Sequence, residues 1–408
     1  MSRDRSPAEQ QIADLLHTAR KSLRLSVAFL SRLDGTTQHL EVVDTSVPFL
    51  FQEGYQQRQE ATLCQAILDR KLPQVIPDLK DHPAAMALPA ARMPRLRSYV
   101  SVPVTLSDGS LYGTFCAAGL TTDKNLTQRD KALMDVLASA AAVIIEPEVR
   151  SQERREEISG RLDPLIAAGG PTVVLQPIVS LATGSRVGAE ALSRFPGDWG
   201  LPPDVCFAEA HSIGAGHRLE VLALERAAAL LDRVEGYVSM NVSPATLLTP
   251  ECGELLGRLP LDRILLELSE HDQVEDYAAL TAVLAPLRED GLRLAIDDVG
   301  AGFSSLRHIV VTAPDVIKVD RSIVAGLDAD PVLAKLVASL ADFAHGCDVQ
   351  VVAEGVETVA EHAVLRELGV DYGQGWHYGR PGPPEALAAT AAPRIPAPRR
   401  EPTATADV

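Results

Sequence analysis

The sequence predicts an α/β protein: a closed (β/α)8 barrel of the TIM type with an antiparallel first strand, preceded by a smaller α+β domain. From residue 172 onward, short apolar runs alternate with longer amphipathic stretches, a pattern typical of a parallel sheet. Eight such runs fit within roughly 240 residues, the size of one closed barrel. Residues 1–146 instead follow the order helix, mixed strands, hairpin and helix, which indicates a separate domain of ordinary size.

The first domain is expected to begin and end with a helix. Apolar residues recur at helical spacing behind Pro7, namely Ile12, Leu15, Leu16, Ala19 and Leu23. Strands are expected at 25–30, 39–43, 73–76, 99–106 and 111–120. The last two are joined by Ser107-Asp108-Gly109-Ser110, a strong hairpin signal. The run from Thr127 to Asp130 resembles a capping box and predicts the closing helix.

A strongly charged stretch, 147–160, predicts the boundary between the domains. Pro147 is expected to break or kink the preceding helix. The stretch is either an inert solvated connector or a signalling helix. The predicted organisation is an α+β domain at 1–146, a linker helix at 147–160, the barrel at 161–388 and a Pro- and Ala-rich, disordered tail at 389–408.

The barrel strands are expected at 172–179, 186–192, 237–242, 263–268, 292–297, 316–319, 349–352 and 371–375. Amphipathic helices are expected at 274–288, 332–344 and 358–368. Only a short turn separates the first two strands, so they are expected to be antiparallel. This is a deviation from the ideal barrel.

Composition excludes several functional classes. The net charge of −17 argues against a nucleic-acid polymer as partner, because such a partner needs a basic surface. The five cysteines are scattered without a metal-ligand spacing, which indicates neither a zinc site nor a disulfide framework and fits a reducing cytoplasm. No apolar run approaches the length of a membrane span. A cytoplasmic protein without membrane association is expected.

Two adjacent aspartates, Asp297 and Asp298, end an apolar run and precede a glycine-rich turn. In a flat strand, neighbouring side chains point to opposite faces, so the two can share a space only where the chain turns. Adjacent ionised carboxylates are stable when hydrated or when a cation lies between them. The alternative is that Asp298 or Ser304 caps the next helix. A cap accounts for one aspartate, whereas a metal site accounts for both.

Most of the predicted barrel strands end with, or are followed by, polar residues, and the set is Gln176, Glu190, Asn241, Glu267, Asp297, Lys318, Asp320, Glu354 and Gln374. Because the carboxyl ends of barrel strands form one rim, these side chains are expected to converge there. Any single one could be an interior polar residue or a helix cap. Together, the carboxylates and one of the amides suit Mg²⁺ or Mn²⁺, and the set lacks the His and Cys ligands typical of zinc.

Residues 160–385 resemble the EAL domain, the family of cyclic di-GMP phosphodiesterases. The motifs that carry the resemblance are Gln176-Pro177-Ile178, Glu190-Ala191-Leu192, Asn241-Val242-Ser243, Glu267-Leu268-Ser269-Glu270, Asp297-Asp298-Val299-Gly300-Ala301-Gly302, Lys318-Val319-Asp320-Arg321, Ala353-Glu354-Gly355-Val356-Glu357-Thr358 and Gly373-Gln374-Gly375. One departure is Val299, where the family usually has Phe. It leaves the metal positions intact and bears on the loop that follows.

The resemblance implies a two-metal site with Mg²⁺ or Mn²⁺. The first metal would be held by Glu190, Asn241, Glu267 and Asp297, and the second by Asp297, Asp298 and Glu354. The implied catalytic residues are Lys318, which orients or deprotonates the attacking water, Glu354, and Glu270, which anchors the loop after the aspartates. The implied substrate contacts are Gln176, Leu192, Arg194, Asp320 and Gln374.

The first domain resembles a GAF sensor domain. The resembling residues are Leu63-Cys64, Val75-Ile76-Pro77-Asp78, Tyr99-Val100-Ser101-Val102-Pro103-Val104 and Leu111-Tyr112-Gly113-Thr114-Phe115-Cys116. GAF domains bind small ligands, tetrapyrroles or nothing, and the ligand here stays open. Neither Cys64 nor Cys116 is followed by His, so no bilin-attachment signature is present, and buried structural thiols are the favoured interpretation.

The expected function is metal-dependent hydrolysis of cyclic di-GMP to linear pGpG, regulated by the GAF-like domain in a homodimer. The first alternative is a cyclic di-GMP receptor that binds and signals without turnover. The second is a metal-dependent hydrolase of another phosphodiester. All implied metal ligands and Lys318 are present, which favours the enzyme.

Overall fold

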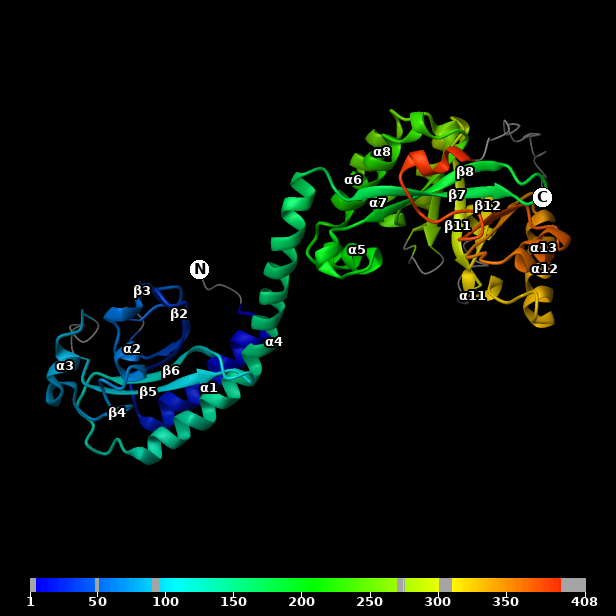
Figure 1. Ribbon diagram of the computed structural model, residues 1–408. Helices are drawn as coiled ribbons and strands as arrows, with labels where there is room; N and C mark the ends of the chain where they lie inside the picture. The colour runs from blue at the N-terminus through cyan, green and yellow to red at the C-terminus, as the bar shows by residue number, and fades with distance from the viewer. Residues whose placement is uncertain are drawn as a thin grey trace, which may run out of the picture. The chain divides into compact units, whose positions relative to one another are not determined.

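The computed structural model describes residues 5–47, 51–89, 96–269, 274, 276–300 and 310–389. The chain forms two compact units, Met1–Arg154 and Arg155–Val408 (Figure 1). Helix α4, Gln128–Ala167, crosses this boundary as one helix of 40 residues. The expected break at Pro147 is therefore wrong, whereas the alternative, a kink at this residue, stays a prediction. A proline removes one backbone hydrogen bond, and the turns on either side of it hold the helix together.

The first unit is built on an antiparallel sheet in the order β3-β2-β1-β6-β5-β4. Its strands are β1 Val27–Leu33, β2 Thr37–Thr45, β3 Gln56–Arg58, β4 Val75–Ile76, β5 Ser98–Thr105 and β6 Leu111–Gly119. The predicted hairpin is β5–β6. Strand β3 was not predicted, because its three polar residues carry no apolar pattern.

Alternate residues of the central strands face two separate cores. Ala28 and Leu30 pack with helices α1 (Pro7–Leu23) and α4, which lie along one face of the sheet (Figure 1). Val27 and Phe29 pack on the other face with α2 (Leu63–Leu68) and α3 (Pro83–Met86). This alternation follows from the two-residue repeat of a strand.

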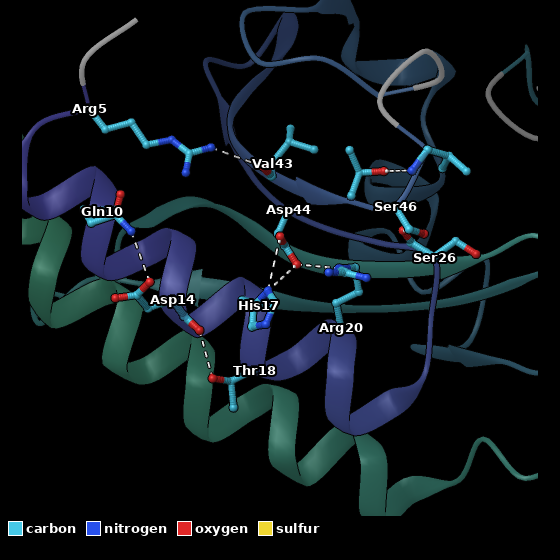
Figure 2. Close-up of polar contacts among 12 residues, drawn as sticks. Arg5, Gln10, Asp14, His17, Thr18, Arg20, Ser26, Val43, Asp44 and Ser46 are labelled. Atoms are coloured by element: carbon cyan, nitrogen blue, oxygen red, sulfur yellow. Dashed lines mark hydrogen bonds and ion pairs between the residues drawn. The ribbon is translucent and has the colours of Figure 1, made fainter. Parts of the chain in front are cut away.

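Helix α1 is fixed at both its start and its outer face. Ser6 and Glu9 form a capping box at its N-terminus. Arg20 forms an ion pair with Asp44 of β2, and His17 lies 3.4 Å from the same carboxylate (Figure 2). The apolar stripe of α1 is buried against its own sheet, with Leu16 fully inaccessible. The apolar stripe of α1 is therefore already packed against residues of its own unit.

The second unit is a closed barrel in the order β10-β11-β12-β13-β14-β7-β8-β9. Its strands are β7 Thr172–Ser180, β8 Arg186–Arg194, β9 Tyr237–Asn241, β10 Ile264–Ser269, β11 Arg293–Val299, β12 Val316–Val319, β13 Gln350–Ala353 and β14 Tyr372–Gln374. Strand β7 is antiparallel to both neighbours, and the other pairs are parallel. The predicted fold class is confirmed.

Helices cover the outside of the barrel strands, and all of them except α5, which packs with α4 and α6, bury a large aliphatic core against the strands. They are α5 Pro203–Ser212, α6 Gly216–Ala228, α7 Pro244–Leu247, α8 Pro250–Leu256, α9 Tyr277–Glu289, α11 Arg321–Val324, α12 Pro331–His345 and α13 Val359–Glu367. Among the described residues, no helix is both long enough and apolar enough to span a bilayer.

Candidate metal centre

The polar residues at the strand ends converge as predicted, and Lys318 of β12 lies at their centre. Its side chain is 1% exposed. Its Nζ lies within 3.5 Å of four carboxylates that come from β8, β10, β11 and the residue after β13. The distances are 2.6 Å to Glu354, 2.9 Å to Glu267, 3.1 Å to Asp297 and 3.5 Å to Glu190.

The carboxylates form two overlapping groups that share Asp297. Glu190, Glu267 and Asp297 offer oxygens that lie within 4.8 Å of one another, and so do Asp297, Asp298 and Glu354. In addition, Oε1 of Glu267 is buried without a hydrogen-bond partner. A buried carboxylate oxygen without a donor needs a cation or a proton to be stable. The residues present therefore fit two hard divalent ions with a bridging aspartate.

A local change of backbone brings the two adjacent aspartates to the same site. Asp298 adopts a left-handed conformation with φ of 59°, and the pairing of β11 with β12 is irregular between Ile296 and Val299. Aspartate tolerates this conformation better than most residues. The turn thus removes the strand alternation that would separate the carboxylates. The alternative cap, Ser304, lies outside the described residues.

The electrostatics of the cluster reflect an excess of negative charge. Burial raises the pKa of Glu267, Asp297 and Glu354, and the neighbouring carboxylates raise it further, to about 8 for Glu354. Lys318 lowers the pKa of all three but does not outweigh these effects. Burial would lower the pKa of Lys318, but the four carboxylates outweigh it and raise the pKa well above its usual value. One lysine cannot neutralise four carboxylates, so the site favours additional cations.

Amide side chains from β9 and β14 hold Glu190 in place. Asn241 Nδ2 donates to Glu190 Oε1 at 3.0 Å, and Gln374 Nε2 donates to Glu190 Oε2. Gln374 also donates to Gln176 at 3.1 Å, and its own carbonyl oxygen is buried without a partner. Gln176 and Gln374, 198 residues apart in sequence, are thus neighbours at the same rim.

A cavity of about 360 Å³ opens beside the carboxylates. Leu192 and Arg194 line it together with Asn241 and Glu267, so two of the predicted substrate contacts face the same space as two predicted metal ligands. Asp320 caps α11 by accepting a hydrogen bond from the backbone of Ser322 at 2.9 Å, and its contact with substrate stays a prediction. Glu270 lies outside the described residues.

One supporting residue was not found from the sequence. Glu220, on the buried side of α6, accepts a hydrogen bond from the backbone N–H of Ser243 at 2.8 Å and contacts His211. It thereby fixes the segment that follows Asn241. Its sequence signal is an acidic residue between Leu219 and Ala223 on the apolar face of a helix, and that signal names no partner.

Comparison with known proteins identifies both units. Residues 159–381, more than half of the chain, match the EAL domain model, and residues 8–146 match a GAF domain model. The probable cyclic di-GMP phosphodiesterase PdeB of Escherichia coli K12 is 31% identical over 264 residues, which are 61% of this chain and 49% of PdeB. The cyclic di-GMP phosphodiesterase PdeL of the same organism is 28% identical over 223 residues, 51% of this chain and 62% of PdeL.

Among solved structures, the PaMucR phosphodiesterase in complex with c-di-GMP superposes with a TM-score of 0.51 at 26% identity. The match covers 57% of this chain and 99% of that one. The chain spans about half the length of PdeB and somewhat more of PdeL. On the extent of the domain match, the chain belongs to the EAL domain family, with a GAF domain before the barrel.

Proposed function

We propose that this EAL-family protein is a metal-dependent phosphodiesterase that hydrolyses cyclic di-GMP to linear pGpG under control of its GAF domain. The observation that carries the proposal is the pair of carboxylate groups that share Asp297 at the barrel rim. The names of PdeB and PdeL, and the ligand of PaMucR, support cyclic di-GMP as the substrate.

The assignment of ligands follows the two groups. Glu190, Asn241, Glu267 and Asp297 would hold one ion, and Asp297, Asp298 and Glu354 the other. Oxygen donors of this kind suit Mg²⁺ or Mn²⁺. When bound, such ions lower the pKa of water and offset the charge of a phosphodiester under attack.

The chain's own residues position the reactants. Lys318, held among the carboxylates, donates hydrogen bonds to the attacking water and keeps its oxygen directed at phosphorus. Arg194, on the wall of the cavity, offers a planar set of donors for a phosphate. Leu192 supplies an apolar surface for a base, and Gln374 holds Glu190 in the orientation that a metal ligand needs.

The test is turnover of cyclic di-GMP by the purified full chain, with pGpG measured by chromatography. Exhaustive EDTA treatment should abolish turnover, and Mg²⁺ or Mn²⁺ should restore it. Ca²⁺ should inhibit, because its longer and looser coordination suits hydroxide formation poorly. Undiminished hydrolysis after EDTA would overturn the metal assignment. Binding of cyclic di-GMP without pGpG under any of these ions would instead establish the receptor alternative.

A further inference from the structure

The core of the GAF unit contains a pair of thiols in contact. Cys64 of α2 and Cys116 of β6 are buried and unbridged, and their sulfur atoms lie 3.4 Å apart. Their exposed fractions are 1% and 0%. The sequence favoured structural thiols at these positions, and the burial agrees with that interpretation. Their mutual contact and their polar surroundings do not follow from it.

Polar side chains surround both sulfur atoms inside an otherwise apolar core. Gln38 Nε2 donates to Cys64 Sγ at 3.0 Å, and the Tyr99 hydroxyl lies 3.0 Å from the same sulfur. Gln38 is held in turn by Gln57, at 2.8 Å. Cys116 Sγ has hydroxyl neighbours at 3.2 Å, those of Ser101 and Thr114. Burying so many polar groups is costly, and a thiol that only fills space does not require them.

The two thiols are not equivalent. Burial alone would raise the pKa of Cys64, but hydrogen bonds from Cys116, Thr114, Tyr99 and Gln38 outweigh it and bring the pKa to about 6. Burial and the neighbouring Cys64 sulfur raise the pKa of Cys116 well above its usual value. The hydrogen bonds therefore favour the thiolate form at Cys64 over the thiolate form at Cys116.

Among the described residues, Cys64 lines a cavity. The cavity measures about 40 Å³, and its wall includes Phe29, Leu40, Tyr55 and Tyr99. A space of roughly 10–15 Å³ on this measure holds one water, so the cavity has room for one very small molecule. Cys116 does not line this cavity, although its sulfur lies 3.4 Å from that of Cys64. A reagent in the cavity therefore meets Cys64 first.

We propose that Cys64 and Cys116 form a peroxide-reactive dithiol that hydrogen peroxide or a small hydroperoxide converts into an intrachain disulfide. The Cys64 thiolate attacks one peroxide oxygen, the O–O bond breaks, and Cys64 becomes a sulfenic acid while the other oxygen takes up a proton and leaves as water or alcohol. The Cys116 sulfur then displaces the sulfenic hydroxyl, which leaves as water with the Cys116 proton. Both sulfurs are oxidised and the peroxide is reduced, a transfer of two electrons.

The geometry of the pair suits the second step. A disulfide requires sulfur atoms about 2.05 Å apart, so the two must approach by less than the width of one atom. Cys116 is fixed in the central strand β6, whereas Cys64 lies on the six-residue helix α2. The movement that brings the sulfur atoms together is therefore expected in α2, a short helix at one face of the sheet.

The experiment uses the full chain carrying Cys347→Ser, which removes the exposed cysteine and leaves four thiols. After treatment with hydrogen peroxide and quenching, the titratable thiols of the denatured protein should fall from four to two, with a mass lower by two hydrogen atoms. Peptide mapping should link Cys64 to Cys116, and thioredoxin or dithiothreitol should reverse the change. The initial rate should rise with pH through about 6 and then level off, as the thiolate forms.

Substitutions of the two cysteines distinguish formation of the sulfenic acid from formation of the disulfide. Cys116→Ser should stop at the sulfenic acid, which dimedone traps on Cys64, and Cys64→Ser should form neither product. Tyr99→Phe and Gln38→Leu each remove a thiolate partner and should slow the reaction several-fold at pH 7. Cys252→Ser, a buried thiol of the barrel, is the matched control and should react like the parent. Four titratable thiols after peroxide treatment, or equal oxidation of Cys64→Ser and the parent, would overturn the proposal.

Discussion

At the residue scale, the proposed function gives Lys318 two roles. In the described structure it offsets part of the charge of four buried carboxylates. We propose that bound metals would take over those carboxylates and leave the lysine to interact with the water and the phosphate. Removal of one partner from a buried ion network costs about 3–5 kcal/mol. The metal-free state should therefore depend on Lys318 for stability more than the metal-bound state does.

Lys318→Ala should lower kcat by about 10²–10⁴-fold, the contribution that a positioned proton-transfer group usually makes. Cyclic di-GMP should still bind within a few-fold of the parent, measured by calorimetry in Ca²⁺ beside a pGpG assay in Mg²⁺. The melting temperature should fall more in EDTA than in Mn²⁺. Lys335→Ala, on the exposed side of α12, is the control and should leave kcat, the binding of cyclic di-GMP and the melting temperature unchanged. Normal turnover by Lys318→Ala would mean that this lysine is wrongly assigned, although the protein would still be an enzyme.

Asp298 combines a charge with an unusual backbone, and two substitutions separate these properties. Asp298→Asn keeps a residue that tolerates positive φ, so its melting temperature should stay close to that of the parent. Asp298→Ala should lose about 1–2 kcal/mol of stability through backbone strain. Both should need much more Mn²⁺ for turnover, because the second metal loses a ligand. Parent-like metal dependence of Asp298→Asn would show that its carboxylate is not a ligand.

At the element scale, Gly300, the residue directly after β11, packs against α11. Gly300 has φ of 105°, and a Cβ there would lie 2.2 Å from Cδ1 of Ile323, a buried residue of α11. Val299, where the family usually has Phe, is buried in the barrel core just before this turn. The position of the paired aspartates thus depends on the packing of a neighbouring short helix.

Gly300→Ala should lower activity by at least tenfold without removing any ligand, because both the backbone strain and the contact with Ile323 displace the turn. The matched control is Gly326→Ala, which has φ of 76° and open space around its Cβ, so only backbone strain applies. Adding Ile323→Val to Gly300→Ala should recover part of the activity. An additive double mutant would show that the contact is unimportant.

Elements were predicted well wherever apolar periodicity marks them. Each barrel strand lies within two residues of its expected range, because a strand buried on both faces reads as an apolar run. Strand β3 and the continuity of α4 through Pro147 were not predicted. Strand β3 depends on its tertiary contact with β2, and α4 continues through Pro147 because a long helix lies on each side of it. Local sequence patterns record neither of these interactions.

At the scale of the whole molecule, the site was predictable because the barrel brings strand ends to one rim. This arrangement predicts that Glu190, Glu267, Asp297 and Lys318 lie close together, as the distances confirm. It could not supply Glu220, which acts through a backbone N–H, or the contact of Cys64 with Cys116 in the GAF unit. Those depend on packing between elements, which has no local signal.

The expected homodimer needs a surface other than the stripe of α1, since that stripe is buried in its own unit. Helix α4 offers one. Small and apolar residues recur at spacings of three and four along its exposed side, namely Ala132, Val136, Ser139, Val143 and Pro147. Val136 and Val143 are 67% and 73% exposed. Such a stripe is the seam that two helices share in a coiled coil.

We therefore predict that light scattering at micromolar concentration gives a dimer, and that Val136→Glu with Val143→Glu gives a monomer. Burying two valines contributes about 3 kcal/mol or more, so their loss weakens association by about 100-fold or more, before the repulsion of facing glutamates. Val332→Glu, at a valine of α12 that is 74% exposed, is the matched control and should remain dimeric. If Val332→Glu dissociates the dimer and the α4 pair does not, the interface lies on the barrel. A parent protein that is monomeric throughout would remove the dimer altogether, and the GAF unit would then have to act on the barrel within one chain.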